Sequence, residues 1–130
     1  MRASAHVRIH HVGITVGDLD RSLAFYRDLL GLRVLDLSEG EQVGSIVGVP
    51  GATARIADLD AGGGQLLELL DYGRGLAGGP PRGPDAAGTV HVSLQVPDLG
   101  AALGRLAGAG FPAMGEPTRL QGGGIWQDCR

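Results

Sequence analysis

The sequence predicts an α+β fold made of two similar halves, each opening with a strand that leads into a helix. Three observations support this: a nine-residue pattern that occurs twice, strands in which apolar and polar residues alternate, and an aspartate after each of these strands at the position of a helix N-cap. At 130 residues the chain is long enough to bury a core of its own. We therefore expect a single domain over residues 1–130.

The repeat sets the organisation of the chain. HVGITVGDL, starting at His11, returns as HVSLQVPDL, starting at His91, with five identical residues at matched places. A fixed offset of this kind predicts the same supersecondary unit twice. We expect module one over about 8–72 and module two over about 89–130, joined by a connection over 73–88 that is rich in glycine and proline and has no periodicity.

The first strand and helix follow from spacing. Over residues 12–16 one strand face is apolar, and the other face carries His11. Asp18 is placed to cap a helix whose apolar residues recur every three or four positions, and Gly31 is a plausible residue to end it. This helix would cover the apolar face of the strand and leave His11 on the uncovered side.

The remaining elements complete a β-α-β-β-β order in the first half. Strands are expected over 32–37, 54–59 and 65–70, with glycine turns at 48–51 and 62–64. The second half repeats the opening, with a strand over 91–96 and a helix that starts after Asp98 and ends near residues 108–110. Beyond it, only 111–114 and 125–130 look like strands.

Composition excludes several classes of protein. The net charge is −3 and the chain has no cluster of basic residues, which argues against a nucleic-acid partner. No apolar run approaches the length of a membrane span, and charged and histidine residues interrupt the N-terminus, which argues against a membrane protein and a signal peptide. The single cysteine, Cys129, allows no intrachain disulfide. We expect a cytoplasmic protein.

One carboxylate stands out. Glu68 lies among four leucines in the strand over 65–70, where an unpaired charge is costly to bury. Strand alternation would direct it to the same side as His11, and the repeat places His91 equivalently in the second half. Two imidazoles and a carboxylate are a suitable ligand set for zinc, nickel, cobalt, manganese or Fe(II). The sequence therefore predicts His11, Glu68 and His91 as ligands of a divalent metal ion.

Further polar residues are candidates to surround this set. Thr15, Ser93 and Gln95 share the strand faces of the two histidines and are candidates for a substrate pocket. His10 precedes His11 and is expected to point to the other face, away from the metal. Four arginines are hints of an anion site, although solvated surface explains each of them more simply: Arg55, Arg74, Arg82 and Arg119.

Three blocks of the sequence resemble a known family. HVGITVGDLDRSLAFYRDLLGL from His11, QLLELLDY from Gln65 and GTVHVSLQVPDL from Gly88 look like blocks of the glyoxalase, bleomycin resistance protein and extradiol dioxygenase (vicinal oxygen chelate) superfamily. The resemblance implies tandem βαβββ modules that form a U-shaped open barrel around a divalent metal, with ligands at His11, Glu68 and His91. The family's usual fourth ligand is a glutamate on the last strand. Glu68 moved by the repeat offset of 80 residues falls at position 148, so module two is expected to be truncated at that strand.

The resemblance also implies a function. It points to a metal-dependent lyase or isomerase that acts on a small substrate with vicinal oxygens through an enediolate, with Glu68 as a ligand and the candidate catalytic base. Two alternatives stay open: an Fe(II) ring-cleaving dioxygenase, and a metal-free protein that sequesters a small molecule such as an antibiotic. A homodimer is expected, because an incomplete second module would expose a sheet edge.

Overall fold

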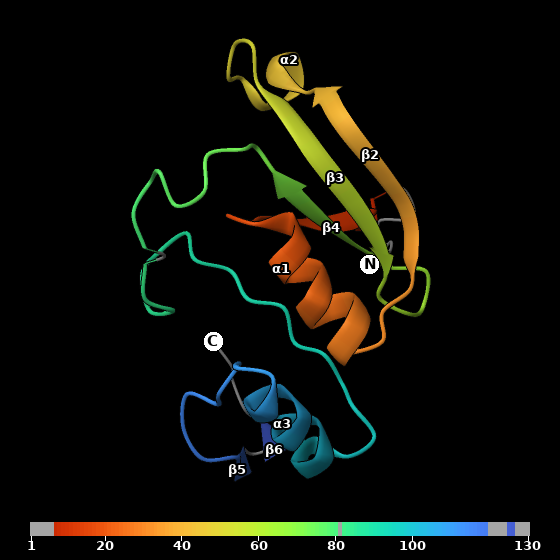
Figure 1. The fold of residues 1–130 in the computed structure, drawn as a ribbon, viewed down its shortest axis with the longest axis vertical. Helices are drawn as coiled ribbons and strands as arrows, with labels where there is room; N and C mark the ends of the chain where they lie inside the picture. The colour runs from red at the N-terminus through yellow and green to blue at the C-terminus, as the bar shows by residue number, and fades with distance from the viewer. Residues whose placement is uncertain (1–6, 81, 120–124, 127–130) are drawn as a thin grey trace, which may run out of the picture. The chain divides into compact units, whose positions relative to one another are not determined.

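A computed structural model describes residues 7–80 and 82–119 and the backbone of residues 125–126 (Figure 1). The chain divides into two compact units, Met1–Pro80 and Pro81–Arg130. Each unit has its own secondary structure.

The first unit is built on an open four-stranded sheet with the order β1-β4-β3-β2. Strand β1 (His11–Thr15) is parallel to β4 (Leu66–Asp71), whereas β3 (Thr53–Asp60) is antiparallel to both β4 and β2 (Val34–Gln42). A short helix, α2 (Gly44–Val47), lies in the connection between β2 and β3. The α+β class and the β-α-β-β-β order expected for the first half are confirmed.

The hairpin of β3 and β4 places one acidic residue opposite another. Its paired residues are symmetrical about Gly63, in a turn where Gly62, Gly63 and Gly64 all have positive φ. Backbone of this kind favours glycine, which has no Cβ to clash. The resulting register pairs Asp58 of β3 with Glu68 of β4.

The helical segment after β1 starts where the sequence predicted, and its second half is a π-helix. Helix α1 (Leu19–Leu23) continues as a π-helix, η1 (Ala24–Leu29), instead of remaining α-helical to residue 30. Asp18 caps the start by accepting a hydrogen bond from the Arg21 backbone N–H at 3.1 Å. At the other end Gly31, with φ of 79°, lets the chain leave the helix and turn into β2.

The core of the first unit lies between this helical segment and one face of the sheet (Figure 1). The buried side chains come from α1, β3 and β4, and each is at most 3% exposed: Leu19, Leu23, Ala57, Leu59, Leu67 and Leu69. Because side chains alternate along a strand, His11, Thr15 and Glu68 belong to the opposite face. The α1 helix packs on the core face, so this second face is called the open face.

The second unit has one helix and two short strands among its described residues. Helix α3 (Leu99–Gly108) is capped by Asp98, which accepts a hydrogen bond from the Ala101 backbone N–H at 2.9 Å. Its buried residues are Ala102 and Leu106. Strand β5 (Thr118–Arg119) pairs antiparallel with β6 (Ile125–Trp126).

The prediction of a strand over 91–96 was wrong. The segment is neither helix nor strand and forms no ladder with the described residues, and its apolar residue Val92 is 37% exposed. In the first unit β1 is held by its hydrogen-bonded neighbour β4, whereas no described residue forms a ladder with 91–96. Without a partner strand, backbone N–H and C=O groups have no ladder to join.

Of the strands predicted over 111–114 and 125–130, the structure has a strand only in the second segment. No strand forms over 111–114, where the only sheet feature is an isolated bridge residue. In the segment 125–130 the structure has β6 at Ile125–Trp126, and residues 127–130 lie outside the described part of the chain.

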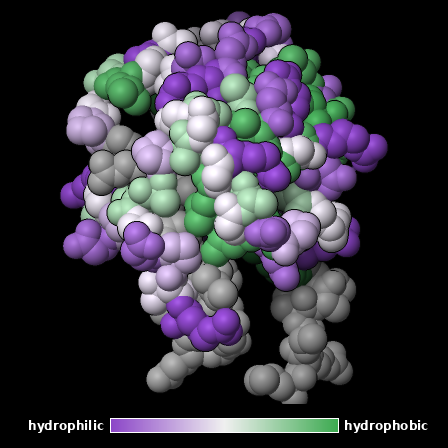
Figure 2. Space-filling model, turned by 60° about the horizontal axis from the view of Figure 1, so that its bottom comes forward, coloured by the Kyte–Doolittle hydropathy of each residue, from purple (hydrophilic) through white to green (hydrophobic). Residues whose placement is uncertain are grey.

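Apolar side chains also reach the surface. On the face shown in Figure 2, hydrophobic and hydrophilic residues are interspersed. Ile46, Val47 and Val49, in and after α2, are 82%, 41% and 41% exposed. Among the described residues, no helix has the length and apolar character that crossing a membrane requires.

Candidate functional site

His11 and Glu68 come together on the open face of the first sheet. The parallel register pairs Gly13 of β1 with Glu68 of β4, and His11 lies two residues before Gly13 on the same face. His11 Nε2 is 3.8 Å from Glu68 Oε1, with the side chains 42% and 21% exposed. A Cβ at Gly13 would lie 4.0 Å from that carboxylate oxygen and 3.3 Å from Leu70, so glycine here leaves space beside Glu68.

His10 is a partner of His11, which the sequence analysis did not anticipate. The Nδ1 atoms of the two rings are 2.9 Å apart, and the rings meet edge to face with centroids 5.2 Å apart. Alternation failed to predict this because β1 begins at His11, and His10 precedes the regular strand. The contact occupies Nδ1 of His11 and leaves Nε2 facing Glu68, which is the arrangement that orients metal-binding histidines.

Asp58 adds a second carboxyl beside Glu68. It is the cross-strand partner of Glu68, and its Oδ1 is buried and accepts no hydrogen bond from the described residues. Burial raises the pKa of Glu68; the His11 imidazole opposes that rise, and the neighbouring Asp58 carboxyl adds to it. Two adjacent carboxyls with little hydration favour a proton or a cation between them. The sequence carried this signal in the symmetry of the hairpin about Gly63.

Three further predicted site residues lie outside the first unit. His91, Ser93 and Gln95 belong to the second unit, where all three are exposed. Within the ranges that the structure describes, no three His, Cys, Asp or Glu side chains gather as a metal-binding group. His91 as the third ligand therefore stays a prediction.

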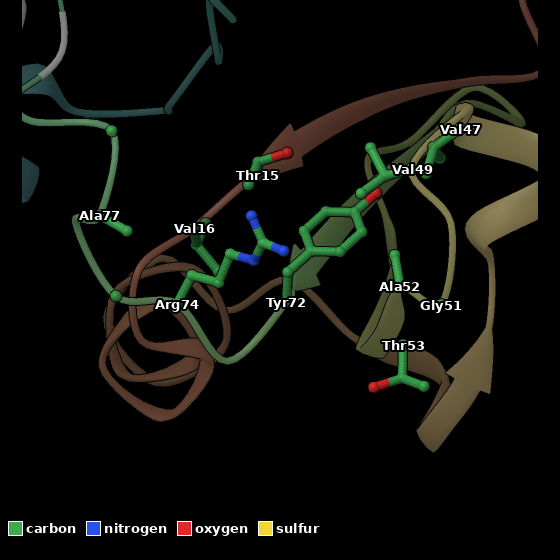
Figure 3. Close-up of a pocket in the computed structure, with 12 residues that line it drawn as sticks. Thr15, Val16, Val47, Val49, Gly51, Ala52, Thr53, Tyr72, Arg74 and Ala77 are labelled. Atoms are coloured by element: carbon green, nitrogen blue, oxygen red, sulfur yellow. The ribbon is translucent and has the colours of Figure 1, made fainter.

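Thr15 lines a hollow of about 640 Å³ in the first unit (Figure 3). One wall of the hollow is formed by the C-terminal ends of the parallel strands β1 and β4. The turn after α2 forms the other wall. Its polar side chains are those of Thr15, Thr53, Tyr72 and Arg74, and its apolar wall includes Val16, Val47 and Val49. Tyr72 was not predicted as a site residue, although it continues the two-residue spacing of Glu68 and Leu70. Arg74 was one of four arginines that hinted at an anion site, with solvated surface as the simpler expectation.

Comparison with known proteins identifies the family. The sequence model of the Glyoxalase/Bleomycin resistance protein/Dioxygenase superfamily matches residues 8–127. The chain belongs to this superfamily. It is 33% identical to a 2-epi-5-epi-valiolone epimerase from an Actinomyces species over 94% of this chain and 70% of the relative. It is 35% identical to an ethylmalonyl-CoA/methylmalonyl-CoA epimerase from Cereibacter sphaeroides over 85% of this chain and 78% of the relative.

The fold of the superfamily is also found in solved structures. A glyoxalase family protein from Enterococcus faecalis superimposes with a TM-score of 0.67 at 21% identity, covering 95% of this chain and 89% of the other. This agreement shows that the chain shares the fold of that glyoxalase family protein.

The residues of the open face suit the divalent metals that superfamily members commonly use. His11 offers an imidazole nitrogen with its other nitrogen hydrogen-bonded, and Glu68 offers a carboxylate 3.8 Å away. The unpartnered Oδ1 of Asp58 is a further oxygen beside them. Nitrogen and carboxylate oxygen are the donors that zinc, nickel, cobalt, manganese and Fe(II) accept.

The raised pKa of Glu68 predicts how the variant Glu68→Gln behaves. The folded protein holds the Glu68 proton more tightly than the unfolded chain, so this contribution to stability is present below the usual glutamate pKa and is lost as pH rises through the raised value. Glutamine stays neutral throughout. In metal-free buffer we expect Glu68→Gln to become more stable than the wild type by about 1 kcal/mol between acidic and neutral pH.

Urea unfolding at a series of pH values measures this difference. Glu41→Gln, an exposed replacement on β2, is the control and should follow the wild type at every pH. A constant offset between Glu68→Gln and the wild type across the series would contradict the prediction.

Proposed function

We propose that this superfamily member is a metal-dependent isomerase or lyase of the glyoxalase type. It would move a proton at a carbon next to a carbonyl group in a small substrate with vicinal oxygens. The observation that supports this most is the His11–Glu68 pair on the open sheet face, where burial and Asp58 raise the pKa of Glu68. The similarity to two epimerases supports the same class of reaction.

Glu68 is proposed as the base that takes the proton from carbon and returns it. A carboxylate is an effective general base when its pKa lies closer to the working pH than that of an ordinary glutamate. Return of the proton to the opposite face of the carbon inverts its configuration, and return to the neighbouring carbon isomerises the substrate. In either case the proton count balances without another reactant.

His11 and His91 are proposed to hold the metal together with Glu68. When bound, the ion supplies positive charge that stabilises the oxygen anion formed as the carbon loses its proton. The hydrogen bond between the Nδ1 atoms of His10 and His11 restrains the His11 ring, so that Nε2 stays directed at the site. Asp58 is proposed to keep Glu68 in position from the neighbouring strand.

The proposal is tested by metal content and by proton exchange. Protein purified without added metal or chelator is subjected to elemental analysis beside the double variant His11→Ala, His91→Ala. We expect about one divalent ion per chain in the wild type and none in the variant. The protein is then incubated in D2O with the substrates named for its relatives, methylmalonyl-CoA, ethylmalonyl-CoA and 2-epi-5-epi-valiolone.

Wash-in of deuterium at one carbon, followed by NMR and absent in Glu68→Gln, would support the isomerase. Bound iron with consumption of oxygen would point to the dioxygenase instead. No metal in either protein after reconstitution would overturn the metal site and leave the small-molecule sequestering protein as the better account.

A further inference from the structure

We propose that Arg74 binds a carboxylate of a small-molecule ligand whose apolar part packs against the valines of the hollow described above. This anion subsite lies in the first unit, beyond the end of β4 that follows Glu68. It is a separate position from the His11–Glu68 pair, and it defines a substrate class: a small organic acid with a compact apolar body.

Arg74 has a charge that no carboxylate of the described residues neutralises. Two other arginines of the first unit have carboxylate partners: Arg55 contacts Glu39 at 2.9 Å and Asp20 at 3.2 Å, and Arg33 contacts Asp60 at 3.4 Å. In the part of the chain that the structure describes, the Arg74 side chain has no ion pair or hydrogen bond. A planar guanidinium matches a carboxylate with two parallel hydrogen bonds.

The hollow offers what such a ligand needs besides the charge. Figure 3 shows the Arg74 side chain reaching toward Tyr72 and Thr15, with Val47 and Val49 on the wall beyond the tyrosine ring. Hydroxyl groups can supply hydrogen bonds to the second oxygen of the carboxylate, whereas valine side chains favour a branched apolar group.

The loop that carries Arg74 is held in place. The Asp71 carboxylate links the start of this loop to the start of α1. Its Oδ1 accepts a hydrogen bond from the Gly73 N–H at 2.8 Å, and its Oδ2 accepts one from the Leu19 N–H at 3.0 Å. The Ala77 N–H donates to the Arg74 carbonyl at 3.1 Å. A Cβ at Gly17 would lie 3.2 Å from the Leu76 side chain, so the loop packs tightly against the end of β1.

The opposite wall is equally constrained. A Cβ at Gly44 would lie 2.6 Å from the Val49 carbonyl oxygen, too close for any side chain. The Val43 and Gly44 N–H groups both donate to the Ala52 carbonyl at 3.1 Å. Both walls are thus formed before a ligand arrives, which lowers the cost of ordering them on binding.

The subsite extends the proposed function. Thr15 and Glu68 lie on one sheet face, and Tyr72 is four residues after Glu68, about 13 Å along an extended chain. A substrate that reacts at Glu68 would therefore reach Arg74 only if its carboxylate and its reacting carbon lie at opposite ends of the apolar body. This relation to the reaction rests on the proposed function, whereas the binding of the carboxylate does not.

The test compares two ligands of the same shape. 4-Methylpentanoate and its neutral amide are titrated into metal-free 15N-labelled protein in Tris buffer, with NMR shifts of the 72–78 segment as the readout. We expect the wild type to bind the carboxylate about tenfold more tightly than the amide, which corresponds to about 1.4 kcal/mol. Arg74→Gln should bind both alike, and Arg33→Gln, which removes the same charge outside the hollow, should keep the preference.

Three results would overturn the subsite: no binding of either ligand, equal binding of both by the wild type, or a preference that survives in Arg74→Gln. Tighter binding of butyl phosphate than of the carboxylate would overturn the assignment of the ligand class. Because no metal is present, failure of the His11–Glu68 site leaves these outcomes unchanged, and failure here leaves the metal site standing.

Discussion

Replacement of His11 by alanine is expected to lower the affinity for Mn2+ or Zn2+ at least about 100-fold, which corresponds to about 2.7 kcal/mol. The imidazole is one of two donors that β1 and β4 bring within 3.8 Å, so its loss would remove the nitrogen that faces the Glu68 carboxylate. His10→Ala should cost less, about tenfold, because His10 only orients the ring of His11.

Equilibrium dialysis with each ion measures both effects. Glu41→Gln is the matched control, since it removes an exposed acidic side chain of the same sheet and should bind metal as the wild type does. Equal affinity in His11→Ala and Glu41→Gln would show that His11 is not a ligand. A larger loss in His10→Ala than in His11→Ala would exchange the roles of the two histidines.

Leu69→Ala is expected to destabilise the protein by about 3 kcal/mol, the middle of the range for removing a leucine side chain from a packed core. Leu69 is fully buried between the sheet and α1, on the central strand β4, which is hydrogen-bonded on both sides. The cavity left behind would border the helix that covers the face opposite Glu68.

Chemical denaturation measures the free energy of unfolding for this variant. Leu37→Ala on β2 is the control with identical chemistry: its side chain is 47% exposed, and its loss should cost less than about 1 kcal/mol. Equal losses in the two variants would contradict the position of the core. A metal-binding assay on Leu69→Ala would also show whether packing on one face affects the site on the other.

The first half was the more predictable one because its determinants are local. Alternation over residues 12–16, the cap at Asp18 and the glycine at 31 each depend on neighbouring residues, and each lies where expected. The same kind of pattern over 91–96 was not sufficient. A strand needs a hydrogen-bonded neighbour, and periodicity reports only which face would be apolar if that neighbour were present.

The expected homodimer, the cytoplasmic location and the third ligand His91 remain predictions. Each depends on contacts with something outside the two described units taken singly: a second copy, a compartment, or the other unit. The family itself needed none of these, since the blocks that begin at His11 and Gln65 are continuous in the chain.

Residue order alone was enough for the superfamily, the element order of the first half and the pairing of His11 with Glu68 on one face, because all three follow from short-range patterns. Folding decided which side chains meet across the chain. In the folded protein His10 contacts His11, Asp58 lies opposite Glu68, and Arg74 lines a hollow together with Thr15. These contacts arise from strand register and from loops anchored by Asp71, which depend on backbone hydrogen bonds between distant residues and leave little trace in local spacing.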